Sequence, residues 1–190
     1  MYGGAGGRNL SGLPSQSAGG TVKVVNSFIL FWILGFLVLA QARAEPVEYA
    51  ARDLNGTEQR ISDYRGKWVL VNFWATWCPP CLTELPELEA FHVKHKDSDA
   101  VVLGVNMENI GLEKLRRFVK ERGVTFPVVQ MEPAATTPFG PVYGMPTSFL
   151  INPQGEVVAR ETGALTAEMV ETFIRKYTQA PAPGPAAGRP

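Results

Sequence analysis

The chain has 190 residues and a mass of 20.7 kDa, and its 18 basic side chains balance 18 acidic ones. This length predicts one domain of ordinary size with additional segments, and a hydrophobic content of 45% excludes an intrinsically disordered chain. Because the formal charge is zero and the sequence holds no block of Lys and Arg, we expect no nucleic-acid partner.

Residues 28–44 have the pattern of a segment that directs export. An apolar run of 13 residues, Phe28 to Ala40, is preceded by a positive charge and followed by an A-x-A motif that ends at Ala44. This order is typical of a signal peptide. Thirteen helical residues span about 20 Å, less than the ~30 Å of bilayer hydrocarbon. We therefore expect cleavage after Ala44, with an uncleaved membrane anchor as the alternative.

Two further stretches are predicted to lie outside the folded domain. Residues 1–27 are rich in Gly and Ser and are predicted to be disordered. They form a long lead before a signal peptide core, so we expect translation to start nearer Val22. Residues 178–190 are rich in Pro, Ala and Gly and are predicted to be a tail. Residues 45–177 remain as one domain, large enough to need no disulfide or metal for stability.

The first half of this domain alternates strand and helix patterns. Two short strand-like pieces flank Asn55-Gly56, a strong signal for a hairpin turn. An apolar run at 67–75 predicts a buried strand, and a helix is expected from Pro79, interrupted and kinked at Pro86.

The second half continues in the same way. An apolar run at 100–106 predicts another buried strand, and apolar residues then recur at helical spacing from Leu112. Two strands are expected at 148–151 and 156–160, and a last helix follows Thr166, which is a plausible N-cap. Strand, helix, strand, helix, hairpin and helix together predict an α/β sheet layered with helices.

The two cysteines of the chain carry its chemistry. Trp77-Cys78-Pro79-Pro80-Cys81 directly follows the buried strand and opens a helix. Cys78 is thus predicted at the N-cap or first helical position, where free N–H groups and the helix dipole stabilise an anion. This position therefore lowers the pKa of the Cys78 thiol and favours the thiolate, which is the reactive form. Cys81, one turn deeper, can attack a mixed disulfide held on Cys78.

Other uses of the cysteine pair are weaker. A zinc site would need His92 and His95, but about 16 Å of helix separates His92 from Cys81, far beyond a ligand sphere. Covalent haem attachment requires His directly after the second cysteine, where the chain has Leu82. A purely structural disulfide would close a ring of two intervening residues and constrain little of the unfolded chain. We expect no metal site and no cofactor.

Three stretches carry a resemblance to a known family. FWATWCPPC at 73–81, Gly144-Met145-Pro146-Thr147, and FLINPQGEVV at 149–158 resemble the thioredoxin superfamily, and within it the exported TlpA/ResA-like thiol-disulfide oxidoreductases. The resemblance implies a thioredoxin-like fold, with a central mixed sheet flanked by helices and an N-terminal β-hairpin extension. It also implies an attacking role for the first thiol, a resolving role for the second, and a periplasmic or otherwise extracytoplasmic location.

The resemblance assigns further residues around the cysteines. Pro146 matches the family's cis-proline, which exposes the backbone of the preceding residue, Met145, to a substrate strand, and Trp77 is expected on the same substrate-binding surface. Glu84 matches a glutamate kept beneath the active site. Glu84 lies three residues after Cys81 on the same helical face. A desolvated carboxylate with a raised pKa at this position can take the proton of the Cys81 thiol. From the residues alone, a solvated helix acid would be favoured at this position.

Two local features bear on the direction of electron flow. Asn72 stands where thioredoxin has a buried aspartate, which leaves Glu84 as the only nearby acid. Pro79 and Pro80 in the active-site loop lack N–H groups, so fewer donors stabilise the Cys78 thiolate. A less stable thiolate makes the reduced dithiol less stable, so we expect a reductant rather than a disulfide-forming oxidant.

The resemblance implies reduction of disulfides in exported proteins. Candidate substrates are the haem-attachment cysteines of apocytochromes c and the thiols of copper-site assembly proteins, with a membrane thiol carrier as electron donor. A copper chaperone that uses the two thiols, with Met145 as a third soft ligand, is the alternative outside catalysis. A thiol peroxidase is a further alternative, but its P-x-x-x-T-x-x-C pattern would need Pro and Thr where this chain has Val71 and Ala75.

Overall fold

The computed structural model of the protein describes residues 45–134 and 136–180. The predictions for residues 1–44 and for most of the tail lie outside the described residues. Within them, no helix has both the length and the apolar character needed to cross a membrane. In chain order the elements are β1 (Ala50–Arg52), β2 (Glu58–Arg60), the 3-10 helix η1 (Ile61–Tyr64), β3 (Trp68–Trp74), α2 (Pro79–His95), β4 (Ala100–Asn106), α3 (Leu112–Glu121), β5 (Val128–Gln130), β6 (Thr136–Thr137), β7 (Gly140–Pro141), β8 (Thr147–Ile151), β9 (Val157–Thr162) and α4 (Ala167–Gln179).

β3 is the central strand of a mixed sheet. The strand order is β5-β4-β3-β8-β9. β3, β4 and β5 are parallel, whereas β8 runs antiparallel to β3, and β9 antiparallel to β8. Every residue of β3 and β4 is buried, as expected of strands covered on both faces. This is the predicted α/β arrangement of a central mixed sheet flanked by helices.

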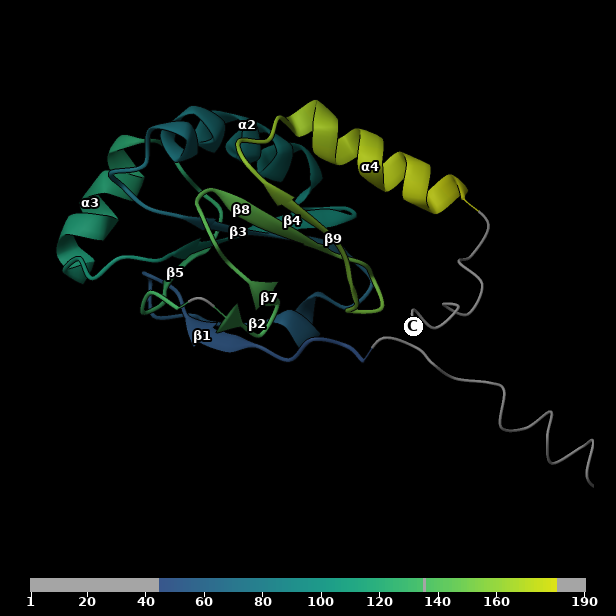
Figure 1. Cartoon of the computed structure of the whole chain (residues 1–190), viewed down its shortest axis with the longest axis horizontal. Coiled ribbons are helices and arrows are strands. Elements are labelled where there is room, and N and C mark those ends of the chain that lie inside the picture. Colours follow the sequence, from purple (N-terminus) through teal and green to yellow (C-terminus); the bar gives the residue numbers. More distant parts are fainter. Residues whose placement is uncertain (1–44, 135, 181–190) are drawn as a thin grey trace, which may run out of the picture. The chain divides into compact units, whose positions relative to one another are not determined.

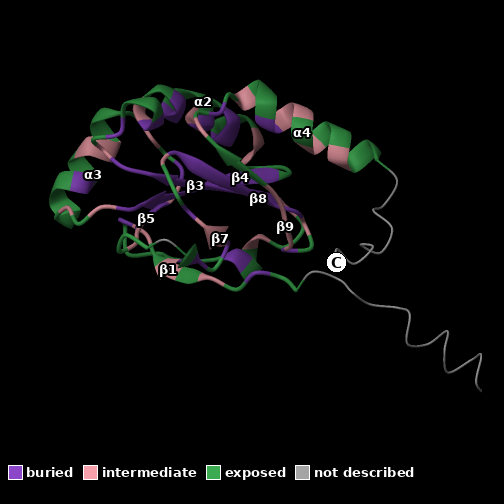
Figure 2. Cartoon of the chain, in the orientation of Figure 1, coloured by how far each residue is buried: buried purple, intermediate pink, exposed green. Residues whose placement is uncertain are grey.

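Two cores lie on opposite faces of the sheet. α2, α3 and α4 cover one face, and the β1–β2 hairpin, η1 and the β6–β7 hairpin lie on the other (Figure 1). Because side chains alternate along a strand, Leu70 and Trp74 of β3 pack beneath the helices, while Val71 and Phe73 belong to the opposite core. The strands are buried and the outer sides of the helices are exposed (Figure 2). Asn72 therefore lies on the helix-facing side of β3.

The predicted hairpin extension at the start of the domain is confirmed. β1 and β2 pair antiparallel, with Ala50 opposite Arg60. In the turn between them, the Asp53 carboxylate accepts hydrogen bonds from the backbone N–H groups of Asn55 and Thr57. Gly56 takes a φ of 85°, which favours glycine.

Two predictions about the helices need correction. α2 continues through Pro86 without interruption. Because Pro86 lies on the exposed side of the helix, its missing N–H removes a hydrogen bond at the surface rather than in the core. α4 extends to Gln179, two residues into the predicted tail, and the Thr178 hydroxyl donates to the Ile174 carbonyl in this last turn. β5, β6 and β7 are too short to give a periodic signal and were not predicted.

Candidate active site

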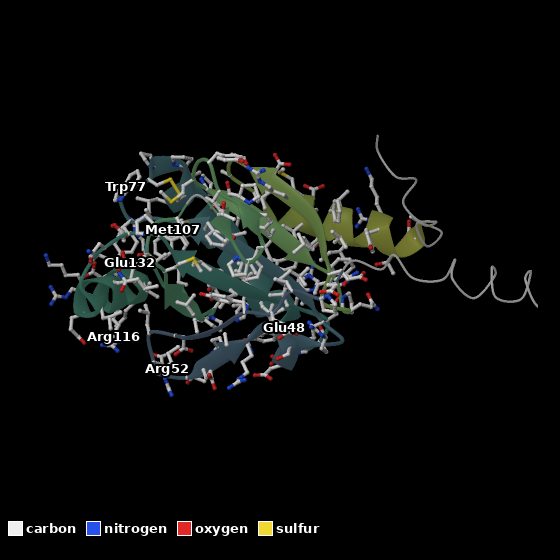
Figure 3. All side chains as sticks on the ribbon, turned by 60° about the horizontal axis from the view of Figure 1, so that its bottom comes forward. Glu48, Arg52, Trp77, Met107, Arg116 and Glu132 are labelled. Atoms are coloured by element: carbon white, nitrogen blue, oxygen red, sulfur yellow. A yellow bond between two sulfur atoms is a disulfide. The ribbon has the colours of Figure 1, made fainter. Side chains whose placement is uncertain are left out.

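The cysteines lie where the central strand passes into α2. Cys78 is the N-cap residue of α2, with extended backbone angles, and it forms a disulfide with Cys81 across a Cα–Cα distance of 5.3 Å. In this oxidised form Cys78 is 4% exposed and Cys81 is fully buried. Figure 3 shows the disulfide at the same end of the domain as Trp77. The cysteine pair thus has the position that the spacing predicted.

The first two helical positions of α2 are occupied by prolines. Pro79 and Pro80 are both exposed, and neither has an N–H group. The first backbone amide after the N-cap residue therefore belongs to Cys81. Of the amides that normally stabilise an anion at a helix start, this loop has lost two.

Glu84 is buried on α2, three residues after Cys81. Only 1% of the Glu84 surface is exposed. One carboxylate oxygen accepts a hydrogen bond from Asn72 Nδ2 at 2.7 Å, and the other accepts one from the backbone N–H of Leu165 at 3.0 Å. Burial raises the pKa of Glu84 to about 7, even though these two hydrogen bonds stabilise the anion and lower the pKa. A carboxyl group with this pKa can gain or lose a proton near neutral pH.

The residues that hold Glu84 come from distant parts of the chain. Asn72 Nδ2 also donates to the Ser148 hydroxyl at 3.0 Å, and Asn72 and Ser148 are opposite each other in the β3–β8 register. The sequence drew attention to Asn72 only as a position without an acid. The contact with Ser148 depends on strand pairing and had no sequence signal.

A second carboxylate, Glu108, holds the loop that leads to the disulfide. It accepts hydrogen bonds from the backbone N–H of Thr76 at 2.8 Å, from the Thr76 hydroxyl at 3.0 Å, and from Asn106 Nδ2 at 2.8 Å. The loop after β3 is thereby attached to the end of β4. Sequence analysis did not identify Glu108. Its signal is an acid two residues after a buried strand that runs parallel to the strand before the cysteines.

The surface beside the disulfide is apolar and exposed. The Met145–Pro146 peptide bond is cis, as the resemblance implied, and Pro146 is buried while Met145 is partly exposed. Trp77 is 66% exposed and Tyr143 is 79% exposed. Met145 also lines a groove of about 360 Å³. The other residues that line it are Met107, Pro133, Ala134, Val142, Tyr143 and Gly144. We call the exposed side chains of Trp77 and Tyr143, together with this groove, the apolar surface.

The structure gives the two histidines roles within the fold. His92 Nδ1 accepts a hydrogen bond from the backbone N–H of Val102 at 3.2 Å, and its ring lies edge-on to Phe126. His95 contacts Asp99 through Nδ1 at 2.9 Å. In the described part of the chain, no three side chains of the types His, Cys, Asp and Glu are grouped as a metal site would require.

This fold and this site define a class of enzyme. A cysteine pair at the start of a helix, directly after the central strand of a mixed sheet, with a cis-proline segment in the same domain, is the arrangement of a thioredoxin-like thiol-disulfide oxidoreductase.

Comparison with known proteins gives the family. A model of the AhpC/TSA family matches residues 42–160, and the chain belongs to this family. It is 40% identical over 132 residues to the thiol-disulfide oxidoreductase ResA of Geobacillus kaustophilus, covering 67% of this chain and 72% of that protein. It is 35% identical over 136 residues to ResA of Halalkalibacterium halodurans, covering 72% and 77%.

A solved structure supports the same assignment. The thiol:disulfide interchange protein of the thioredoxin family from Chlorobium tepidum matches with a TM-score of 0.64 and 26% identity. The match covers 72% of this chain and 98% of that one. The resemblance to the thioredoxin superfamily is thus confirmed, and the protein is a thiol-disulfide oxidoreductase.

Proposed function

We propose that this enzyme reduces disulfides in exported proteins, using Cys78 as the attacking thiol, Cys81 as the resolving thiol and Glu84 as the proton acceptor for Cys81. The observation that carries the proposal is the buried Glu84 carboxyl, whose pKa of about 7 suits proton exchange, placed one helical turn from Cys81. An extracytoplasmic location is supported by the signal-peptide pattern of residues 28–44.

The reaction balances over two exchanges. In the reduced enzyme, the Cys78 thiolate attacks one sulfur of a substrate disulfide, that bond breaks, and the released substrate thiolate takes up a proton. Cys81 then gives its proton to the Glu84 carboxylate and attacks the Cys78 sulfur. The second substrate thiolate leaves, so the substrate gains two electrons and the enzyme is left with the Cys78–Cys81 disulfide. A dithiol donor, proposed to be a membrane thiol carrier, must reduce this disulfide again.

The apolar surface is the proposed binding site for the substrate. Tyr143 lines the groove, and Trp77 exposes its ring directly before Cys78; aromatic side chains contribute strongly to recognition of peptide segments. We propose that an extended segment carrying the substrate disulfide lies along Met145 and Pro146. Cysteines awaiting haem attachment in apocytochromes c and cysteines of copper-site assembly proteins are the substrates to test first.

Trapping tests the assignment of the thiols. With Cys81→Ser, the substrate should stay covalently bound to Cys78 and be recovered after non-reducing electrophoresis. Cys78→Ser is the matched control, because it keeps the buried Cys81 thiol but lacks the attacking thiol at the N-cap, and it should trap nothing. Equal trapping by both variants would contradict the assigned roles.

A redox titration tests the direction of exchange. Because Pro79 and Pro80 remove two N–H groups from the helix start, we expect a reduction potential well below the roughly −120 mV of strong disulfide-forming oxidants. A potential near that value would reject a reducing role. Tight stoichiometric Cu(I) binding by the reduced protein, without disulfide reduction, would favour the copper chaperone instead.

A further inference from the structure

The Asn72 side chain donates both of its amide hydrogen bonds inside the core. It is fully buried, and Nδ2 contacts Glu84 Oε1 at 2.7 Å and Ser148 Oγ at 3.0 Å. Among the described residues, its amide oxygen has no hydrogen-bond partner. A buried acceptor without a protein partner costs free energy, and the two donor contacts offset that cost in this orientation of the amide.

The orientation of the amide matches one charge state of Glu84. A carboxylate only accepts hydrogen bonds, so the N–H₂ side of Asn72 must face it while Glu84 is ionised. Turning the amide over would place its oxygen against the carboxylate, a contact that becomes favourable only when Glu84 carries a proton. The Ser148 hydroxyl accepts the second N–H of the same group, so both amide donors are engaged while the carboxylate of Glu84 selects the donor side.

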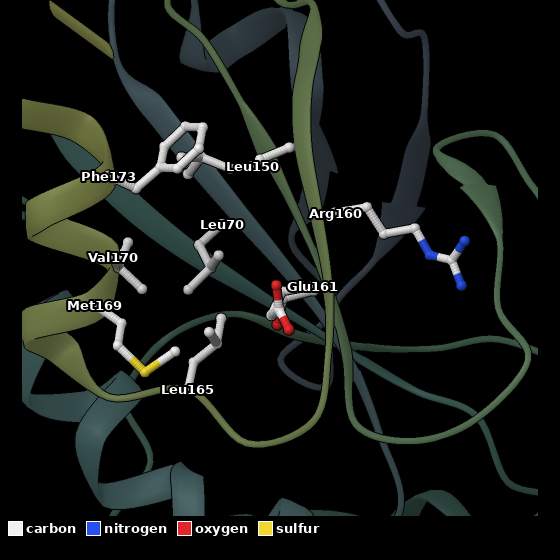
Figure 4. A pocket seen from close by; sticks show the side chains of 10 residues that line it. Leu70, Leu150, Arg160, Glu161, Leu165, Met169, Val170 and Phe173 are labelled. Atoms are coloured by element: carbon white, nitrogen blue, oxygen red, sulfur yellow. The ribbon is translucent and has the colours of Figure 1, made fainter. Parts of the chain in front are cut away.

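The surroundings of this contact contain few charges. Ser148 lines a pocket of about 200 Å³ between the β8–β9 pair and α4, together with apolar residues that include Leu70, Leu165 and Phe173. The charged residues that line the pocket are Arg160 and Glu161 of β9. Figure 4 shows the Arg160 side chain directed away from α4, whereas Glu161, which is exposed, lies opposite Ser148 in the β8–β9 register.

The elements packed against Glu84 also contribute little charge. On α2, Cys81 is bound in the disulfide and does not titrate, and the exposed Glu87 carboxylate accepts a hydrogen bond from the backbone N–H of Ala167 at 3.1 Å. α4 lines the pocket with Met169, Val170 and Phe173. Burial raises the pKa of Glu84, and the hydrogen bonds from the Leu165 backbone amide and the Asn72 side chain lower it. Of these contributions, only the hydrogen bond from Asn72 comes from another side chain, so a substitution can remove it.

We propose that Asn72 and Ser148 are positioning residues of the enzyme: Ser148 anchors the Asn72 side chain beside Glu84, and the Asn72 amide donates to the Glu84 carboxylate and so favours its ionised, proton-accepting form. The inference rests on the proposed function, because it gives Glu84 the role of proton acceptor for Cys81. It adds that this role depends on two uncharged residues, one in β3 and one in β8. Neither of them contacts the cysteines or the substrate in this scheme.

The test measures ionisation of Glu84 directly. The side-chain carboxyl of Glu84 is followed by carbon NMR during a pH titration of the oxidised, full-length protein. Asn72→Ala should move the midpoint upward from about 7 by about one pH unit, because a hydrogen bond to the anion is lost. Ser148→Ala should move the midpoint in the same direction by a smaller amount.

Ser148→Thr is the matched rescue variant. It keeps the hydroxyl, and its added methyl group can enter the pocket that Ser148 lines. Its midpoint should equal that of the unchanged protein. Thr137→Val is the control for the loss of a buried hydroxyl elsewhere, since the Thr137 hydroxyl bonds to the Gly140 carbonyl in the β6–β7 hairpin. It should not change the midpoint.

The outcomes separate the inference from the proposed function. If the midpoints of Ser148→Ala and Asn72→Ala stay within a few tenths of a pH unit of the unchanged protein, the inference is overturned even when disulfide reduction is intact. If Asn72→Ala does not fold, the comparison of Ser148→Ala with Ser148→Thr decides alone. Loss of trapping by Cys81→Ser would overturn the proposed function without affecting the titration.

Discussion

The two sides of the Cys78–Cys81 disulfide differ in almost every property. Beneath it, Glu84, Asn72 and Ser148 are buried and hydrogen-bonded to one another. Beside it, Trp77 and Tyr143 are exposed. The difference teaches that the proposed function would divide proton chemistry and recognition between separate parts of one small domain. Changes on the buried side should alter pH dependence, and changes on the exposed side should alter substrate affinity.

The largest effect is expected at the boundary between the two sides. Cys78→Ala should reduce disulfide reductase activity to the background rate, since the attacking sulfur is lost. The free energy of unfolding should change little, because a disulfide that encloses two residues constrains the unfolded chain only slightly. Activity assays with a protein disulfide and urea unfolding of the same sample check both halves. A large loss of stability with residual activity would contradict the separation.

On the buried side, Glu84 should make stability depend on pH. Its pKa rises from 4.5 unfolded to about 7 folded, so the native state binds more protons between these values. Stability from Glu84 is therefore complete below pH 4.5, falls as the pH rises toward 7 and stays constant above, a loss of about 3 kcal/mol. The difference in unfolding free energy between the unchanged protein and Glu84→Gln, measured in urea at pH 4.5 and 8, should change by this amount.

His92 explains why the comparison with Glu84→Gln is needed. Burial lowers the pKa of His92, so this group contributes stability above its unfolded pKa of about 6.5 and loses it as the pH falls. Its effect opposes that of Glu84 over part of the same range, and the raw pH profile shows only their sum. Both proteins contain His92, so the difference between them isolates Glu84. A difference that does not vary with pH would contradict the raised pKa.

On the exposed side, Trp77→Ala and Tyr143→Ala should weaken substrate binding. Loss of an aromatic anchor at an interface costs about 1–2 kcal/mol, which corresponds to a rise in KM of roughly 5- to 30-fold with kcat retained. Val93→Ala is the control, because Val93 is also exposed and apolar but lies near the far end of α2. A fall in kcat with unchanged KM would place these rings in the chemistry instead.

The smallest effect is expected at the loop before the disulfide. Glu108→Gln weakens the hydrogen bonds to the Thr76 backbone and hydroxyl, and should lower the unfolding free energy by about 1 kcal/mol. Glu132→Gln removes the same charge from an exposed residue and should change stability less than this. Equal effects of the two substitutions would show that charge, rather than attachment of the loop, is responsible.

The sequence predicted features that depend on neighbouring residues. The buried central strands, the helix start at Cys78 and the hairpin at Asn55-Gly56 all follow from local patterns, and the structure has each of them. The contacts around Glu84 join residues 12, 76 and 81 positions apart. No periodicity or capping motif specifies such contacts, because they depend on which strands pair and in what register. Asn72 was therefore noticed, but its partners were not.

The hydrogen bond from Leu165 to Glu84 connects the segment before α4 to α2, the helix that begins at the cysteines. Leu165 precedes α4, and its backbone amide satisfies one oxygen of a carboxylate that lies 81 positions earlier. A shortened enzyme that ended after β9 would keep all five strands of the sheet and both sulfurs, yet it would leave that oxygen without its donor. Attempts to build a minimal catalyst from this scaffold must therefore retain the C-terminal segment for its chemistry as well as for its packing.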